Sequence, residues 1–423
     1  MFKNFGYYLI FTFVCISLFL WFIATPGLKL DTETVGKSLG IIGVTLFALT
    51  FVLNTRIRLL ENLFGGIDKV YIAHHITGGL TFVFLLFHPL FLLTEYLELS
   101  LASAFDFLIP SIHDVARSFG ILALLTMIFL LVITFYLNLP YHIWKFTHKF
   151  MGLAFIFASL HVLLVKTDIS FNMPLRAWVI ALMVIGLSAY LYKTILGRFT
   201  LPRSKYTLSS TKKLNNDVYE VILSATDKPI TFIPGQFCFF EFENKITGTE
   251  SHPFSIASKP GDPNLRFVIK VSGDFTSKLD NLETGETVFV EGAYGGFKFS
   301  NHYKKQIWIA GGIGITPFLS MVTSVSVDQQ VDLYYSVKTE SEFIGLEELE
   351  QISKQNKNIT LIKWLSETRG RLTMEEINKT SGNLSQNIIY LCGPVAMMRS
   401  MVDQAKGFGI YGRNIRMEEF ELV

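Results

Sequence analysis

The chain has 423 residues, of which half are hydrophobic and 17% are charged. Its net charge of +2 gives no indication of nucleic-acid binding, and no basic cluster interleaved with aromatic residues occurs, so we expect no nucleic-acid partner. Its three cysteines, Cys15, Cys238 and Cys392, have neither zinc-site nor disulfide spacing, which excludes a disulfide scaffold and suits a reducing compartment.

The first 200 residues consist mostly of apolar runs, whereas the rest of the chain has an ordinary polar composition. The first run has no convincing small-residue cleavage pattern, so we expect a retained helix rather than a signal peptide. We predict six membrane-spanning helices: about 7–24, about 38–53, a third that holds His74 and ends near 94, about 115–137, a fifth that holds His148, and about 175–196. Six spans place both termini on one side of the membrane.

The third run contains two histidines, His74 and His88, with no charged residue between them. An ionisable side chain inside a bilayer is costly and usually functional. Fourteen residues of helix advance about 21 Å and about 1400°, so the two rings face nearly the same way. His75 would miss that direction by about 140°, which favours His74 as a ligand and leaves His75 as the alternative.

The fifth run contains a second pair, His148 and His161. Their spacing of thirteen residues leaves a misfit of about 140°, so we predict a local distortion between them, such as a π-bulge. Imidazole is a common ligand of haem iron, and two histidines on each helix can reach two cofactors stacked across a bilayer. We therefore predict that the axial ligands of two b-type haems are His74, His88, His148 and His161.

Lysine and arginine are more frequent on the face that carries the termini. This bias predicts a multi-pass protein of the cell membrane with both termini in the cytoplasm. It assigns His74 and His148 to an inner haem, and His88 and His161 to an outer one. An acidic loop, residues 95–114, is then expected on the outer face.

Short β-rich runs begin at about residue 206 and are separated by turns such as Pro234-Gly235. This pattern predicts a small antiparallel barrel. The barrel region contains three motifs in order: HPFS at 252–255, KVSGDFTSKL at 270–279 and EGAYGGF at 291–297.

The last region begins at about Lys304, where a buried strand leads into Gly311-Gly312-Ile313-Gly314-Ile315-Thr316-Pro317. A glycine-rich turn between a strand and a helix leaves room and free N–H groups for a dinucleotide pyrophosphate. A second strand, VDLYYSVK, and the segment YLCGP at 390–394 follow. We predict three domains: a six-helix haem bundle at 1–200, an antiparallel β-barrel at 201–303, and an α/β dinucleotide-binding domain at 304–423.

The ordered motifs and the histidine spacing resemble the ferric reductase and NADPH oxidase transmembrane superfamily, whose dehydrogenase part is similar to ferredoxin-NADP reductase. The chain looks most like the compact bacterial NADPH oxidases, over essentially its whole length. The resemblance implies that 201–303 is an FAD-binding barrel and 304–423 an NAD(P)-binding domain. It implies flavin contacts from Pro253, Phe254 and Ser255 at the isoalloxazine, where Ser255 supplies a hydroxyl, and from Gly273, Phe275 and Thr276 at the FAD pyrophosphate. It also makes His252 a cofactor-binding residue.

The same resemblance implies contacts with the nicotinamide nucleotide. It places Gly311, Gly312, Gly314, Thr316 and Pro317 at the phosphates, Ser336 and Lys338 near the adenosine ribose, and Cys392, Gly393 and Pro394 at the nicotinamide. The alternative for Cys392 is an ordinary core position. No acidic residue ends the second strand, and Lys338 can meet a 2′-phosphate, so we expect NADPH rather than NADH.

The family also has an aromatic residue near the C-terminus that stacks on the flavin, and Phe420 is the candidate here; the alternative is an ordinary terminal strand residue. Ser255, Cys392 and Phe420 are therefore the expected catalytic residues. If Phe420 stacks on the flavin, Phe420→Ala should change the apparent affinity for nicotinamide.

These parts predict an NAD(P)H oxidase that passes electrons through FAD and two haems to dioxygen and produces superoxide, with no obligatory protein partner. A ferric-chelate reductase would use the same path, and an electron-entry or sensor subunit for a protein partner is a third reading. Eukaryotic oxidases have a further histidine and an aromatic residue where this chain has Leu92 and Ala154, the latter followed by Phe155. These departures concern the specificity for oxygen and leave the haem ligands unchanged.

Overall fold

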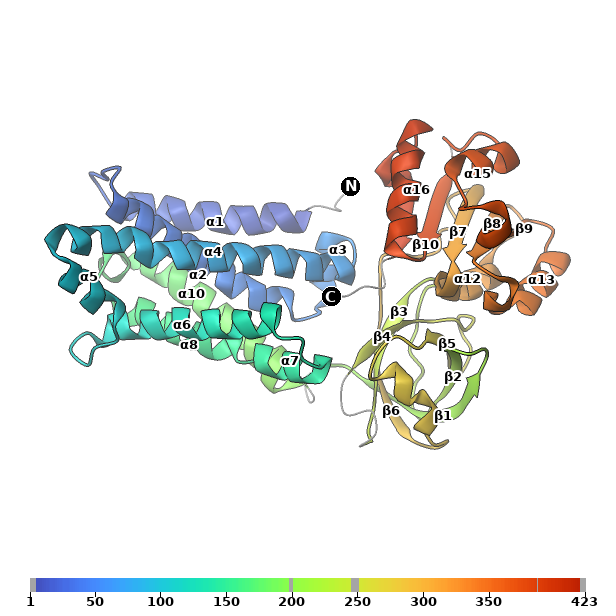
Figure 1. Cartoon of the computed structure of the whole chain (residues 1–423), viewed down its shortest axis with the longest axis horizontal. Helices are drawn as coiled ribbons and strands as arrows, with labels where there is room; N and C mark the ends of the chain where they lie inside the picture. Colours follow the sequence, from blue (N-terminus) through green and yellow to red (C-terminus); the bar gives the residue numbers. More distant parts are fainter. Residues whose placement is uncertain (1–4, 198–200, 245–250, 386, 419–423) are drawn as a thin grey trace. The chain divides into compact units, whose positions relative to one another are not determined.

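The computed structural model describes residues 5–197, 201–244, 251–385 and 387–418 of the chain. Its residues form two compact units, Met1–Leu201 and Pro202–Val423. The first unit is made of helices, and the second contains two β-sheets (Figure 1).

The first unit is a bundle in which long helices run side by side (Figure 1). Its helices are, in chain order, α1 (Phe5–Ala24), α2 (Thr32–Leu53), α3 (Arg58–Phe64), α4 (Ile67–Leu99), α5 (Leu101–Leu108), α6 (Val115–Tyr136), α7 (Tyr141–His148), α8 (Met151–Leu164), α9 (Asp168–Phe171) and α10 (Met173–Tyr190), which continues into the π-helical turn Leu191–Ile195.

Among the residues that the structure describes, six stretches are long and apolar enough to cross a membrane, which confirms the predicted number: α1, α2, α4, α6, α7 with α8, and α10 with its π-helical turn. Helix α2 packs against α1, α4 and α10, and most of its second half is buried. Phe47, Phe51 and Phe155 lie in the core, with ring centroids 5.0 to 5.6 Å apart. Aromatic contacts of this kind stabilise the packing of α2 against α8.

The prediction of an acidic loop between the third and fourth spans was wrong, because most of this segment is helical. Helix α4 continues through Pro89, and α5 follows directly, with the Ser100 hydroxyl accepting the N–H of Ser103 as an N-terminal cap. Tyr96 and Phe107 stack with 4.4 Å between ring centroids. Acidic side chains on exposed helix faces need no loop, so charge alone misled the prediction.

The second unit begins with an antiparallel sheet that curls into a nearly closed barrel. Its strands are β1 (Ser204–Lys213), β2 (Val218–Ala225), β3 (Phe237–Phe242), β4 (His252–Ser255), β5 (Asn264–Lys270) and β6 (Thr287–Tyr294), in the order β4-β3-β6-β1-β2-β5. A bridge between Ile256 and Phe267 links the two ends of the sheet. Buried side chains that include Tyr206, Phe240 and Phe267 fill the interior.

The rest of this unit is a parallel sheet with helices on both faces. The strands β7 (Lys305–Gly311), β8 (Gln330–Val337), β9 (Ile359–Leu365), β10 (Ile388–Cys392) and β11 (Ile415–Glu418) have the order β11-β10-β7-β8-β9. The helices are α12 (Thr316–Met321), α13 (Leu346–Gln355), α14 (Ser366–Arg369), α15 (Met374–Ser381) and α16 (Val395–Gly407). Together the two parts confirm the predicted barrel and α/β fold.

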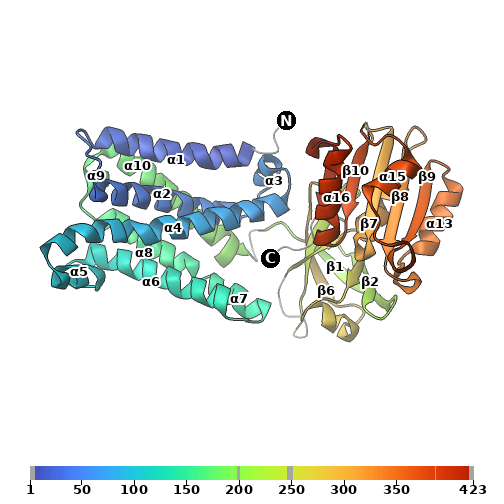
Figure 2. The same cartoon turned by 45° about the horizontal axis from the view of Figure 1, so that its top comes forward.

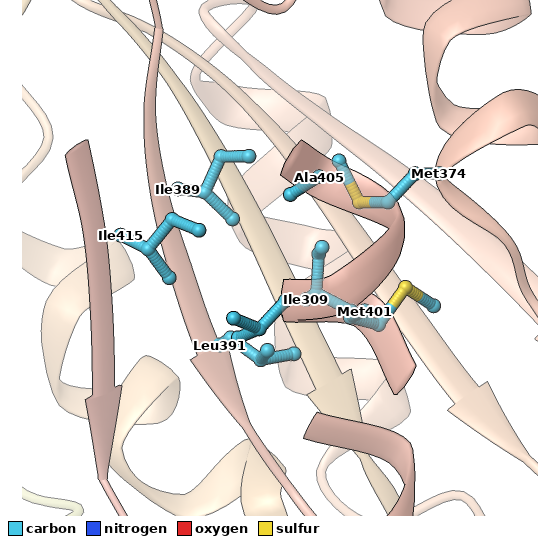
Figure 3. Close-up of a pocket in the computed structure, with 8 residues that line it drawn as sticks. Ile309, Met374, Ile389, Leu391, Met401, Ala405 and Ile415 are labelled. Atoms are coloured by element: carbon cyan, nitrogen blue, oxygen red, sulfur yellow. The ribbon is translucent and has the colours of Figure 1, made fainter. Parts of the chain in front are cut away.

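Both faces of the parallel sheet are buried, which is typical of sheets covered by helices. Trp308 packs on the side of α12 and α13, whereas Ile307 and Ile309 pack on the side of α15 and α16 (Figure 2). A small gap on the second side is lined only by apolar side chains (Figure 3): Ile309, Met374, Ile389, Leu391, Met401, Val402, Ala405 and Ile415. This gap therefore belongs to the hydrophobic core.

Arg266 of β5 joins the barrel to the parallel-sheet part. Its guanidinium binds Glu220 of the barrel and Glu348 of α13, each at 2.7 Å. The Ser320 hydroxyl of α12 also donates to the carbonyl of Ser258, which precedes β5, at 2.7 Å. These contacts hold the start of the nucleotide domain beside the barrel.

Candidate functional site

The four predicted histidine ligands form two facing pairs in the helical bundle. The ring centroids of His74 and His148 are 6.4 Å apart, and those of His88 and His161 are 6.5 Å apart. Two imidazoles that bind one metal ion from opposite sides, each at about 2 Å, have ring centres roughly 6 Å apart. The spacing of both pairs therefore fits an ion held between them.

Three of the four rings are oriented by a backbone carbonyl on another helix. The Nδ1 atom of His74 lies 3.0 Å from the oxygen of Thr50, that of His88 lies 2.7 Å from Gly36, and that of His161 lies 2.8 Å from Ala116. An Nδ1–H that donates to a carbonyl leaves Nε2 as the atom that can bind metal. His75 is exposed, so the structure places His74 rather than His75 opposite His148.

Two glycines make room for the rings of one pair. A Cβ atom at Gly40 of α2 would lie 2.9 Å from the His88 ring, and one at Gly120 of α6 would lie 2.9 Å from the His161 ring. No group of three or more metal-binding side chains occurs among the described residues. Pairs of histidines without a third ligand suit a metal whose other ligands come from a porphyrin.

The fifth span is distorted between its histidines, as predicted, but the distortion is not a π-bulge. Helix α7 ends at His148 and α8 begins at Met151. The Phe150 N–H binds the Thr147 carbonyl at 3.0 Å, and the Leu153 N–H binds the Phe150 carbonyl at 2.9 Å. These three-residue bonds raise the rotation to about 120° per residue, whereas a π-bulge would lower it. Thirteen residues of regular α-helix end about 140° short of four whole turns, so the two rings can face the same way only if the helix gains rotation between them.

The HPFS motif forms β4, which pairs with β3 at the edge of the barrel. The His252 ring stacks on Phe275 with 4.0 Å between centroids, and Phe254 lies 5.9 Å from the same ring. The Ser255 hydroxyl is buried and has no hydrogen-bond partner among the described residues. A buried hydroxyl without a partner is rare in native proteins unless a ligand satisfies it. The structure thus brings together the two segments that were predicted to contact the flavin.

The predicted pyrophosphate loop is partly closed by its own side chain. The Thr276 hydroxyl accepts the N–H groups of Ser272 and Gly273, at 2.9 and 3.0 Å. The Gly273 N–H therefore bonds to Thr276 in this structure, and the contact of this loop with the FAD pyrophosphate stays a prediction. Thr276 is the first residue of the short helix Thr276–Asn281, and its hydroxyl binds backbone groups of the turn that precedes this helix, as threonine hydroxyls commonly do.

The glycine-rich turn lies where β7 meets β10. Gly311 ends β7, and Gly314 approaches the backbone of β10 so closely that a Cβ atom would lie 2.3 Å from the Cys392 oxygen. A Cβ atom at Gly393 would lie 3.0 Å from the Gly311 Cα atom. Thr316 begins α12 and donates its hydroxyl to the Ile313 carbonyl at 2.8 Å, with Pro317 next in the chain. The predicted phosphate and nicotinamide segments are therefore adjacent.

The side chain of Cys392 lies in the hydrophobic core and is wholly buried. Burial raises the pKa of its thiol well above the ordinary value, so the group stays protonated at neutral pH. The Cys392 side chain therefore occupies an ordinary core position, which was the alternative to a nicotinamide contact. Its backbone borders the glycine turn.

A carboxylate from a later segment lies at the end of β8, and the sequence analysis did not anticipate it. Ser336 is the next-to-last residue of β8, and Lys338 is exposed just beyond the strand. The Lys338 N–H donates to Glu342 Oε2 at 3.2 Å, so this carboxylate folds back to the strand end. No acidic residue ends β8 itself, as the sequence indicated, but a short helix, Glu340–Glu342, returns the chain and brings the Glu342 carboxylate to the strand end. Phe420 lies outside the described residues.

Three family models match the chain in sequence order. Residues 39–159 match the ferric reductase like transmembrane component, residues 203–305 an FAD-binding domain, and residues 308–403 an oxidoreductase NAD-binding domain. The chain has the architecture of the ferric reductase and NADPH oxidase superfamily. The chain thus combines a ferric-reductase-like transmembrane part with FAD- and NAD-binding domains.

Several curated proteins are similar to this chain. The 2-halobenzoate 1,2-dioxygenase electron transfer component of Burkholderia cepacia is 28% identical over 186 residues, which are 41% of this chain and 54% of that protein. Flavohemoprotein A of Dictyostelium discoideum is 27% identical over 286 residues, which are 60% of this chain and 72% of that protein. The chain spans little more than half the length of the first of these relatives.

Solved structures that are similar to this chain include the ferredoxin-NADP+ reductase of Plasmodium falciparum, which is 22% identical with a TM-score of 0.44; the match covers 51% of this chain and 95% of that one. The flavohemoglobin of Malassezia yamatoensis is 18% identical with a TM-score of 0.49 and covers 74% of this chain and 90% of that one.

Proposed function

We propose that the protein oxidises cytosolic NAD(P)H through FAD and reduces dioxygen to superoxide on the opposite side of the membrane. Two haems b, one at each histidine pair, would carry the electrons singly, because nicotinamide gives two electrons and haem iron accepts one. The observation that carries this proposal is the spacing of the two pairs, 6.4 and 6.5 Å between ring centroids.

Side chains in two places would support this electron transfer: the histidines of the helical bundle and Ser255 of the barrel. In the bundle, the Thr50, Gly36 and Ala116 carbonyls orient three imidazoles and leave their Nε2 atoms for iron. In the barrel, the buried Ser255 hydroxyl is the group we assign to the flavin ring. The charge bias of the loops supports cytoplasmic termini, so His74 and His148 would be the inner pair.

The acceptor outside the membrane is the second part of the proposal. Dioxygen needs no built binding site, and each electron that reaches it yields one superoxide anion. A ferric-chelate reductase is the second candidate, supported by the match of residues 39–159 to the ferric reductase transmembrane model. An electron-entry subunit would instead require a protein partner for turnover.

The deciding experiment is turnover of the purified full-length protein with FAD and either NADPH or NADH. Reduction of cytochrome c that superoxide dismutase suppresses supports the oxidase. Dismutase-insensitive turnover, together with reduction of a ferric chelate without oxygen, would replace it with the reductase. The subunit reading is supported only if neither acceptor is reduced while flavin reduction proceeds.

The glycines beside one histidine pair give a test of the haem assignment. We expect Gly40→Ala or Gly120→Ala to reduce the retention of one haem, because the new methyl group would press on an imidazole ring 2.9 Å away. Overpacking costs of about 1–3 kcal/mol correspond to roughly a tenfold weaker site. Haem content per protein, measured as the pyridine haemochrome, checks this expectation.

Gly79→Ala is the matched control, because a Cβ atom at Gly79 of α4 would meet no heavy atom within 4 Å. Full haem content in Gly40→Ala and Gly120→Ala, equal to that of Gly79→Ala, would argue against haem at this pair.

The carboxylate at the end of β8 makes nucleotide preference testable. Glu342→Gln is expected to raise the preference for NADPH over NADH, because it removes a negative charge near the expected position of a 2′-phosphate. The change should be roughly tenfold, which corresponds to about 1.4 kcal/mol. The ratio of kcat/KM for the two nucleotides in flavin reduction measures it. Glu350→Gln, which removes an exposed carboxylate paired with Lys363, is the control, and equal ratios in both variants would exclude a role for Glu342.

A further inference from the structure

The two histidine pairs differ in the hydrogen bonds behind their rings. Both members of the pair His88 and His161 have Nδ1 within 2.8 Å of a carbonyl oxygen. In the other pair, His74 has such a bond at 3.0 Å, but the Nδ1 atom of His148 is buried and has no partner among the described residues. One pair thus has two carbonyl bonds and the other has one.

The helix around His148 explains the difference. On a helix, the carbonyl four residues earlier is a natural acceptor for a side chain that bends back along the axis, and for His148 that residue is Trp144. The Thr147 hydroxyl already donates to the Trp144 carbonyl at 2.9 Å. The Trp144 indole also stacks on the His148 ring, with 5.5 Å between centroids and 21° between planes. The ring is therefore held by stacking in place of a carbonyl.

A hydrogen bond from Nδ1–H to a carbonyl makes an imidazole more basic at Nε2. A more basic axial ligand favours ferric over ferrous iron, and hydrogen bonding to the ligands is one of the ways a protein sets haem potential. This inference rests on the proposed function, because it takes each histidine pair to hold a haem. We infer that the pair His74 and His148 gives its haem the higher reduction potential, so that the first electron entering the bundle stays there.

Charge is the competing cause of such a difference. Asp114 caps α6 two residues before Ala116, whose carbonyl binds His161, so its carboxylate lies near the outer pair. A negative charge would also favour ferric iron and lower the potential of that haem. If the hydrogen bonds cause the difference, the outer haem must still have the lower reduction potential after the charge of Asp114 is removed.

The experiment is an anaerobic spectroelectrochemical titration of the purified full-length protein. Wild-type protein is expected to show two one-electron waves in the Soret and α-bands. His88→Met keeps a ligand to iron but changes its type, which moves only the wave of the outer haem. The wave that stays in place belongs to His74 and His148, and it should be the more positive of the two wild-type waves.

Asp114→Asn keeps a capping side chain and removes its charge. In this variant the outer wave should move to a more positive potential and still lie below the inner one. The inference is overturned if His88→Met moves the more positive wild-type wave, or if Asp114→Asn alone makes the two waves coincide. Wild-type protein without any Soret band would instead overturn the proposed function, so the two failures are distinguishable.

Discussion

His161→Ala is expected to abolish one of the two haem signals and to stop electron transfer beyond the flavin, while NAD(P)H still reduces FAD. His161 faces His88 across 6.5 Å, and its ring is held by the Ala116 carbonyl at 2.8 Å. Alanine removes the whole ligand, so the loss should exceed the roughly 10- to 100-fold effect of removing an outer-shell partner of a metal ligand. Reduced-minus-oxidised spectra and stopped-flow flavin reduction measure the two parts separately.

The matched control is His113→Ala, which removes an exposed histidine close in sequence to the cap of α6. It should keep both haem signals and full turnover. Haem content and turnover in His161→Ala equal to those of His113→Ala would show that this imidazole is not a ligand. A loss of flavin reduction as well would show that the variant had failed to fold, and His88→Ala, which removes the opposite ring of the pair, then provides the second test.

Gly314→Ala is expected to slow flavin reduction by NAD(P)H about tenfold or more without changing haem or FAD content. Its Cβ atom would lie 2.3 Å from the Cys392 oxygen and 2.7 Å from the Gly393 nitrogen, and backbone atoms cannot rotate away. The glycine turn and β10 must then separate, at a cost of about 1–3 kcal/mol or more. Because we propose that the N–H groups of this turn bind the nucleotide phosphates, displacement of the turn should appear as weaker nucleotide binding.

Stopped-flow kinetics over a range of NADPH and NADH concentrations separate binding from hydride transfer in this variant. Gly412→Ala serves as the control, since a Cβ atom at Gly412 would meet nothing within 4 Å. Gly314→Ala protein that is as stable as the control and reduces its flavin at the wild-type rate would mean that the nucleotide does not use this turn.

Much of the fold could be predicted because its signals are local. Hydrophobic length predicts the spans, and alternating apolar residues predict strands such as β2 and β5. The glycine turn after β7 is also readable, since its spacing and flanking elements are continuous in sequence. Charge without periodicity was a poorer guide, because the expected loop at 95–114 contains the end of α4 and the whole of α5.

The amino-acid sequence by itself determined that two histidine pairs would lie on two membrane-spanning helices, because helical rise and rotation follow from residue spacing alone. Only the tertiary structure decided which groups hold each ring and where the fifth span gains its extra rotation, which is at Phe150. It also decided that the Cys392 thiol lies in the core and that the Glu342 carboxylate returns to the end of β8. These features depend on carbonyls, side chains and loops that come from distant positions in the chain. A pattern within one segment contains no information about which partner another segment will bring to it.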